Sequence, residues 1–181
     1  MERIGVGFSG GISPSDIVDC VRLAEELGYE SAWVAEGHGG DQFSILTACA
    51  VVTSRIKLGT SISSVYVRTA PTIAMAAATV DHISGGRFIL GLGTSHKVQV
   101  EPEHGLEFTR PIPRLRECVD IVRSVLWGGE GSYHGDVYNI DHFDLWFKPI
   151  RRTIPIYVAA VFPKMLEVSG EISDGAMLVW C

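Results

Sequence analysis

Short apolar runs alternate with helical patterns along the whole chain, and this alternation limits the fold more than any other feature. We expect strands at six places: 4–8, 32–35, 56–62, 88–92, 154–160 and 176–180. Helical patterns lie between them, at 14–27, 42–53, 69–84, 113–127 and from 163 onward. Short buried runs separated by amphipathic helices are typical of βαβ units, in which the strands are parallel. The chain is therefore predicted to be an α/β protein.

The first helical pattern carries clear start and stop signals. Ser13 is suited to cap the helix, Pro14 fits its first position, and Asp16 completes a capping-box-like start. Gly28 marks the end, because glycine readily adopts the left-handed conformation that follows a last helical turn. Between these signals, apolar residues recur at helical spacing, at Ile17, Val21 and Ala24.

Residues 128–153 interrupt the alternation and are predicted to be an insertion. The short runs 132–134 and 137–139 flank Gly135-Asp136, a pair that favours a two-residue β-hairpin turn. We expect this hairpin to decorate the sheet of a single domain that spans 1–181.

Two architectures fit six βα repeats. A doubly wound sheet would be complete at about this length, whereas a (β/α)8 barrel typically needs about 250 residues. The chain, however, stops inside the apolar run 176–181, with no helix or polar tail after it. That ending favours a barrel from which two or more βα units are missing, as a truncated gene product or a partial chain.

The charge balance argues against one class of partner. The chain has 21 Asp and Glu residues against 15 Lys and Arg residues, and its formal net charge is −6. Binding to nucleic acid through its phosphates requires a basic surface, so we do not expect nucleic acid as a partner. The N-terminal residues lack the pattern of a signal peptide, and no apolar run approaches the ~18 residues of a membrane span. We expect a soluble protein with no membrane partner.

The cysteines indicate the redox setting. Cys20, Cys49, Cys118 and Cys181 are scattered without metal-binding spacing, so no metal site is expected. The first three lie in apolar helical patterns and are predicted to be buried free thiols. This usage favours a reducing, cytoplasmic location.

Three segments are more specific than the general pattern. They are Arg55-Ile56-Lys57-Leu58-Gly59-Thr60, then Arg68-Thr69-Ala70-Pro71, then Ser84-Gly85-Gly86-Arg87-Phe88-Ile89-Leu90-Gly91-Leu92-Gly93. Each alone is a weak signal, because Ser-Gly-Gly-Arg is merely a good turn between a helix and a strand. In this order and spacing they closely resemble the luciferase-like monooxygenase superfamily, and within it the F420-dependent, methylenetetrahydromethanopterin reductase-like oxidoreductases. The resemblance covers residues 4–180.

This resemblance implies a (β/α)8 TIM barrel of the bacterial-luciferase-like type, here with about six βα units. It implies coenzyme F420, or FMN as the alternative, at the carboxyl ends of the strands, where barrel enzymes place their sites. It further implies a small-molecule substrate and a homodimer.

Glu36 follows the predicted strand 32–35, so its side chain should project from the carboxyl end of a strand. In F420-binding relatives an acidic residue at this point lies near the deazaflavin ring. Many of them have Asp followed by His, whereas here Gly37 follows Glu36 and His38 comes one position late. The alternatives are a solvated loop acid for Glu36 and a surface residue for His38. Asp41 is predicted to cap the next helix.

Ser61 and Ile62 fall at the end of the predicted strand 56–62. The superfamily often has a non-prolyl cis peptide at this point, and in relatives the resulting bulge backs the central ring of the cofactor. The alternative is an ordinary trans strand end.

Gly93, Thr94, Ser95 and His96 follow the predicted strand 88–92, and the resemblance places the first three beside the cofactor. In one related group the residue that matches His96 is a glutamate proposed as proton donor. A histidine suits acid–base chemistry near neutral pH, so His96 is our candidate for that role, with His104 as a second choice. The alternative for His96 is a structural histidine.

Ala160, Val161 and Lys164 lie in the turn between the predicted strand 154–160 and the next helix. In relatives a glycine-containing version of this turn meets the phosphate-bearing tail of the cofactor, and a helix N-terminus suits a phosphate. Here Phe162 stands where glycine is common, which puts close approach of the backbone in doubt. The alternative is a plain turn with a surface lysine.

The main hypothesis is an oxidoreductase that exchanges a hydride between F420 and an unidentified organic substrate, with His96 and Glu36 as its catalytic residues. The second is an FMN-dependent monooxygenase of the same superfamily. The third is a catalytically incomplete fragment, whose unpaired strand edges would favour association.

Overall fold

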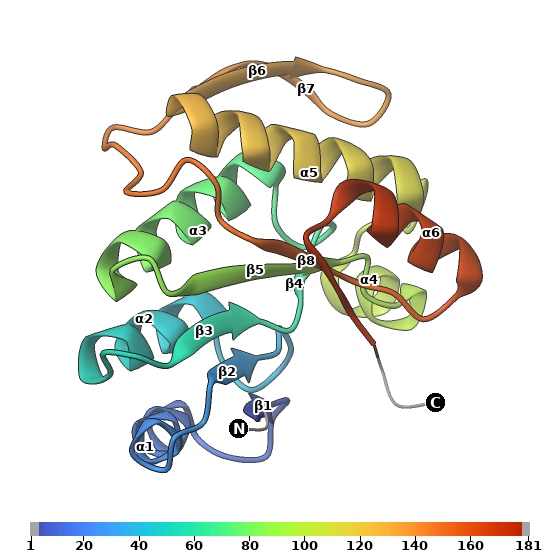
Figure 1. Ribbon diagram of the computed structural model, residues 1–181. Coiled ribbons are helices and arrows are strands. Elements are labelled where there is room, and N and C mark those ends of the chain that lie inside the picture. Colours follow the sequence, from blue (N-terminus) through green and yellow to red (C-terminus); the bar gives the residue numbers. More distant parts are fainter. Residues whose placement is uncertain (1–3, 179–181) are drawn as a thin grey trace.

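The computed structural model describes residues 4–178, in which helices line one side of a parallel sheet (Figure 1). The sheet contains β1 (Gly5–Phe8), β2 (Ser31–Val34), β3 (Lys57–Thr60), β4 (Ser63–Ser64), β5 (Phe88–Gly93), β8 (Ile156–Ala159) and β9 (Gly175–Met177). The outer helices are α1 (Pro14–Glu26), α2 (Gln42–Val52), α3 (Ala70–Ser84), α5 (Pro111–Gly128) and α6 (Pro163–Ile172). A short helix, α4 (Lys97–His104), and a hairpin of β6 (Glu130–His134) and β7 (Asn139–Asp144) complete the described chain.

The order of the strands decides between the two architectures. Neighbouring strands follow the order β1-β2-β3-β5-β8-β9, with β4 beside β5, and all of these pairs are parallel. The outer helices follow the same order, since α1 contacts α2, α2 contacts α3, α3 contacts α5, and α5 contacts α6. A doubly wound sheet would reverse its strand order and carry helices on both faces. The described residues therefore form the curved wall of a (β/α) barrel, as predicted.

Alternate residues of the strands face the helices and the concave inner side. In β2, Ala32 and Val34 are buried against the helices. Trp33, between them, points to the inner side, where its ring stacks on that of Tyr157 with 5.9 Å between centroids. A Cβ added at Gly175 would lie 2.8 Å from the Tyr157 ring, so glycine on the inner side leaves space for these aromatic rings.

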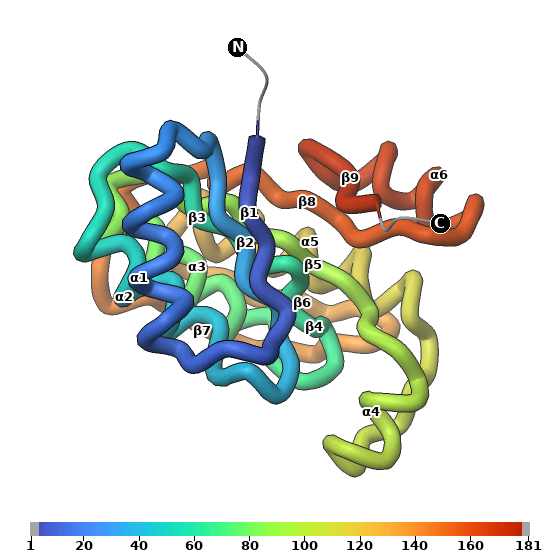
Figure 2. The backbone as a smooth tube through the Cα atoms, turned by 90° about the horizontal axis from the view of Figure 1, so that it is seen from below, coloured from blue at the N-terminus to red at the C-terminus, as the bar shows by residue number. Residues whose placement is uncertain are grey.

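The predicted elements are present, and two short ones were missed. Each predicted strand and helix has a counterpart, although several ends differ by one to three residues, and the hairpin run predicted at 137–139 is the longer strand Asn139–Asp144. The final residues of the predicted strand 176–180 lie outside the described residues, as does Cys181. The missed elements are β4 and α4. Helix α4 contains Pro102 and is mostly polar, and it lies beyond the carboxyl end of β5, away from α1, α2 and α3 (Figure 2).

Two predictions were wrong. Cys20 is exposed, because it lies at the edge of the buried stripe of α1, whereas Cys49 and Cys118 are buried free thiols. The hairpin turn is longer than two residues, since His134 pairs with Asn139 and the connection spans 135–138. The cause is a contact from another element, because the Glu117 carboxylate accepts hydrogen bonds from the backbone N–H groups of residues 136, 137 and 138 at 2.9–3.2 Å.

Among residues 4–178, no helix is long and apolar enough to cross a membrane.

The turn that joins α3 to β5 explains the Ser-Gly-Gly-Arg motif. Gly85 and Gly86 have φ angles of 68° and 87°, in the left-handed region that favours glycine. Arg87 then extends under α2, where its guanidinium donates to the carbonyl oxygens of Ala50, Thr53 and Ile56 at 2.8–3.0 Å. The motif therefore fixes the packing of a helix end and does not contact the candidate site.

Glu25 joins the end of α1 to the start of β3. Its carboxylate accepts hydrogen bonds from the backbone N–H groups of Ser54, Arg55 and Ile56 at 2.6–3.1 Å. Burial alone would raise the pKa of Glu25, but the hydrogen bonds from Ile56, Arg55 and Ser54 outweigh it and lower the pKa from 4.5 to about 2. Because the folded pKa is depressed, Glu25 stabilises the fold above pH 4.5, and this contribution is lost as the pH falls toward 2.

Replacing Glu25 with Gln should lower the free energy of unfolding at pH 7 by about 1–2 kcal/mol, because hydrogen bonds to a charged acceptor are stronger. The difference from wild type should shrink as the pH falls from 4.5 toward 2. Urea denaturation at pH 7 and pH 3 measures the loss of unfolding free energy and its dependence on pH. Glu26→Gln is the matched control, since Glu26 is exposed and pairs only with Arg22 in the described contacts, at 3.5 Å. A loss that does not change with pH would contradict this role for Glu25.

Candidate active site

A small cavity lies at the carboxyl ends of β2, β4 and β5. Its volume is about 60 Å³, and three segments enclose it: the loop after β2, the turn at β4, and helix α4. The lining residues are Glu36, Gly37, His38, Ser64, Val67, Ser95, Gln99, Val100, Glu103 and His104. Three residues predicted for the cofactor site, Glu36, His38 and Ser95, are thus brought together.

Glu36 is a fixed acceptor on the cavity wall, because both oxygens of its carboxylate are engaged. Arg68 donates from Nε to Oε1 at 2.6 Å, and the backbone N–H of Ser64 donates to Oε2 at 2.7 Å. The Ser63 hydroxyl donates to Oε2 at 3.4 Å. The Glu36 side chain is only 16% exposed, so it is not a solvated loop acid.

Asp41 caps α2, as predicted, and also binds Arg68. Its Oδ1 accepts from the backbone N–H of Ser44 at 2.8 Å, and its Oδ2 accepts from Arg68 Nη2. Burial acts to raise the pKa of Asp41, but the hydrogen bonds from Ser44 and Arg68 outweigh it and hold the pKa below its ordinary value of 3.8. One guanidinium therefore joins the loop after β2 to the start of α2.

The peptide bond between Ser61 and Ile62 is cis, as the resemblance implied. The turn places β4 beside the end of β5, so that Ser64 pairs with Gly93. A Cβ added at Gly93 would lie 2.8 Å from Ile62 Cγ1 and 3.3 Å from the Ala159 Cβ. Ile62, Gly93 and Ala159 come from three neighbouring strand ends, and we call them the apolar shelf.

Helix α4 closes one side of the cavity. Ser95, just before it, has a φ of 55°, and Gly105, just after it, has a φ of 65°. The ring of His38 lies 3.1 Å from the Glu103 carboxylate, which links the loop after β2 to α4. His104 lines the cavity near this pair.

His96 lies apart from this group. It occupies the N-cap position of α4, is exposed, and does not line the cavity, whereas Thr94 is half-buried between β5 and His96. The structure therefore places His96 outside the cavity, at the start of α4, and its acid–base role stays a prediction.

The turn before α6 supplies a free helix end. Ala160 is buried and its N–H donates to the Met177 carbonyl at 3.1 Å, while Val161 is 43% exposed. Phe162 is the N-cap and makes no side-chain capping bond, and Lys164 is exposed in the first helical turn. An exposed helix N-terminus beside a lysine suits an anionic group.

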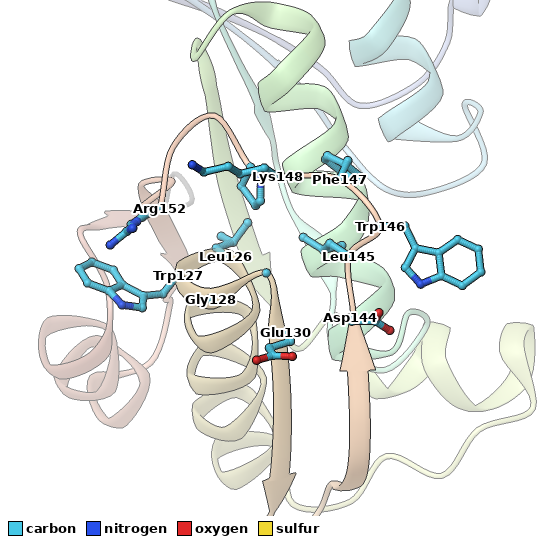
Figure 3. Close-up of a pocket in the computed structure, with 12 residues that line it drawn as sticks. Leu126, Trp127, Gly128, Glu130, Asp144, Leu145, Trp146, Phe147, Lys148 and Arg152 are labelled. Carbon is cyan, nitrogen blue, oxygen red and sulfur yellow. The ribbon is translucent and has the colours of Figure 1, made fainter.

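A larger hollow lies at the other end of the barrel wall. It measures about 680 Å³ and lies where α5 ends and the hairpin begins (Figure 3). Its rim includes Trp146, which is 94% exposed, and Trp127, which lies 5.3 Å from the Arg152 guanidinium. Because α5 runs back toward the amino ends of the strands, this hollow is remote from Glu36. The candidate site is therefore the smaller cavity, where barrel enzymes carry their chemistry.

Three features near the strand ends could contact a deazaflavin or flavin. A cavity of about 60 Å³ holds a water or two, so a tricyclic ring would lie across the open strand ends beside it. The apolar shelf could supply an apolar contact there, and Glu36 could supply a fixed hydrogen-bond acceptor. The start of α6 with Lys164 offers charge for a phosphate-bearing tail.

Sequence reasoning missed Arg68 and the cavity side of α4. Arg68 was noted only as part of the Arg-Thr-Ala-Pro segment, although a charged residue so close to a strand end was a readable signal. Gln99 and Glu103 gave no such signal, because helix α4 itself was not predicted.

Comparisons with known proteins show the family of the chain. The family described as luciferase-like monooxygenase matches residues 2–180. The chain is 33% identical over 177 residues to 5,10-methylenetetrahydromethanopterin reductase of Archaeoglobus fulgidus, covering 97% of this chain and 52% of the relative. It is 30% identical over 189 residues to F420-dependent glucose-6-phosphate dehydrogenase of Amycolatopsis mediterranei, covering 97% and 56%.

A solved structure is also similar to this chain. The coenzyme F420-dependent tetrahydromethanopterin reductase from Methanopyrus kandleri superposes with a TM-score of 0.91 at 31% identity, over 97% of this chain and 55% of the other. A monooxygenase solved with FMN shares only 17% identity, which shows the fold alone. The chain spans about half the length of the relatives it matches.

Proposed function

Because this chain belongs to the luciferase-like monooxygenase family, we propose that it acts in an oxidoreductase that exchanges a hydride between coenzyme F420 and a small organic substrate. Of the proteins named above that are at least 30% identical to this chain, the two whose names specify a coenzyme name F420. The observation that carries the proposal is the meeting of Ile62, Gly93 and Ala159 next to Ser64, whose backbone N–H holds the carboxylate of Glu36.

Each part of the site has a role in this proposal. When bound, F420 supplies the carbon that gives or accepts the hydride. The apolar shelf would back the ring, and Glu36 would offer it a hydrogen-bond acceptor. Lys164 and the start of α6 hold the anionic tail.

The proton of the reaction needs a titratable group near the ring. His96 is our candidate, because it follows the end of β5 by three residues and has an exposed side chain. His38 and His104 face the cavity and form the second line of candidates.

The alternative is an FMN-dependent monooxygenase built on the same fold. The fold cannot separate the two, because function resides in the site. A catalytically incomplete chain is the third hypothesis, and it predicts no binding of either cofactor.

Wild-type protein should quench F420 fluorescence with micromolar affinity and show no comparable binding of FMN. Glu36→Ala should raise the Kd for F420 about 10- to 150-fold, because it removes a charged hydrogen-bond acceptor worth about 1.5–3 kcal/mol. Glu26→Ala, which removes an exposed carboxylate of α1, should leave the Kd unchanged. Tight binding of FMN alone would favour the monooxygenase, and binding of neither would favour the incomplete chain.

A further inference from the structure

Arg68 connects its own segment, before α3, to the loop after β2 and to the start of α2. Its Nε donates to Glu36 after β2, and its Nη2 donates to Asp41 at the start of α2. Its guanidinium lies 5.1 Å from the centre of the Phe43 ring in the first turn of α2. The Arg68 side chain is 23% exposed, so the group is held in place by its contacts.

These contacts fix the orientation of the Glu36 carboxylate. Oε1 is held by Arg68 and Oε2 by the backbone N–H of Ser64, so the carboxylate cannot rotate without breaking a hydrogen bond. Ser64 in turn pairs with Gly93 of the apolar shelf. A substitution of Arg68 should therefore change the orientation of the Glu36 carboxylate and, through it, the turn at Ser63 and Ser64.

The geometry of the two bonds requires a guanidinium. Arginine presents donors in a rigid planar fork, so one side chain can direct different nitrogens at Glu36 and Asp41. A lysine ammonium carries the same charge at a single nitrogen. Charge alone is thus not sufficient for the bridge that the structure shows.

We propose that Arg68 is a positioning residue, which locks the Glu36 carboxylate against the Ser64 backbone and so fixes the acceptor that faces the cofactor. The part that concerns the cofactor rests on the function proposed above. The lock itself is a property of the protein without ligand. The existence of the lock and the proposed function can therefore be disproved separately.

The first test is hydrogen exchange of the free protein. Arg68→Lys should increase exchange at the Ser64 amide about tenfold, since it removes the bond that holds the acceptor of that amide. Amides of α1 and β1 should keep their protection. Arg22→Lys, at an exposed arginine of α1, is the matched control and should change neither. Unchanged protection at Ser64, or an equal increase across the whole chain, would overturn the lock.

The second test is a double-mutant cycle on F420 affinity, read from fluorescence quenching. Arg68→Lys should raise the Kd about tenfold in the wild-type background and less than about twofold in Glu36→Gln protein, because Arg68 acts through Glu36. A full-sized effect in the Glu36→Gln background would overturn the positioning role. If wild-type protein does not bind F420, the proposed function fails, and the exchange experiment still decides whether the lock exists.

The variant Asp41→Asn tests the lock in a protein that should fold normally. Asparagine caps helices as well as aspartate does, so α2 should form normally. The variant weakens only the second anchor of Arg68, and we expect a smaller increase in exchange at Ser64, in the same direction. No increase in this folded variant would contradict the role of Asp41 in the lock.

Discussion

Replacing Arg151 with alanine should lower the free energy of unfolding by about 3–5 kcal/mol, because it leaves a buried carboxylate without its partner. Asp81 of α3 is 1% exposed. Arg151 Nε lies 3.1 and 3.0 Å from its two carboxylate oxygens, and Nη2 also binds Asp81. Nη2 donates in addition to the Phe88 carbonyl at 2.7 Å. The pair therefore ties the segment before β8 to α3 and β5.

Urea denaturation followed by circular dichroism measures this loss, and Arg22→Ala is its control. Arg22 forms only exposed ion pairs in the described contacts, at 3.7 Å to Asp19 and 3.5 Å to Glu26, so its removal should cost less than about 1 kcal/mol. The double variant Asp81→Leu with Arg151→Met should be more stable than Arg151→Ala, because no buried charge remains unpaired. An Arg151→Ala protein within about 1 kcal/mol of wild type would contradict this account.

Local signals were sufficient to predict the elements of the fold. Ser13 and Asp16 form the predicted capping box of α1, and Gly85 ends α3 in the left-handed conformation. The choice between an open sheet and a barrel was different, because periodicity describes single elements and not the order of strands. That choice was supported by the ordered motifs. One of their residues is structural, since Arg87 binds carbonyl groups at the end of α2 and the start of β3, whereas Arg68 and Gly93 lie at the candidate site.

Contacts between distant segments limited the prediction of the site. Glu36 could be recognised because it directly follows a predicted strand and because the family resemblance implies an acidic residue at that point. Its partner Arg68 lies 32 residues later, and nothing local indicates their contact. The same holds for the hairpin, where Glu117 binds a loop that the Gly135-Asp136 pair alone predicted to be shorter. The same limit applies to His96. Its position at the start of α4 could not be predicted, because that helix was not predicted.

Replacing Gly93 with alanine should weaken F420 binding while leaving the fold nearly as stable. The new methyl group would lie 2.8 Å from Ile62 Cγ1 and 2.9 Å from its Cδ1, so one of the two must move. Ile62 is half-buried at the open ends of the strands and can give way outward. The displacement would then fall on the apolar shelf, where we propose that the ring lies. In a core that cannot adjust, overpacking costs about 1–3 kcal/mol of stability. If the bound ring instead has to absorb a displacement of that cost, the Kd for F420 should rise about 5- to 150-fold.

Gly7→Ala is the matched control for this variant, because a Cβ at Gly7 in β1 would meet nothing within 4 Å. Both substitutions add one methyl group to a glycine of a parallel strand, so a general effect on strand backbone would appear in both. We expect fluorescence quenching to show a higher Kd for F420 only in Gly93→Ala, with both proteins unfolding at nearly the same temperature as wild type. Equal affinities in the two variants would mean that the cofactor ring does not rest on Ile62. An unfolding temperature lowered only in Gly93→Ala would mean that the core, and not the shelf, absorbs the methyl group.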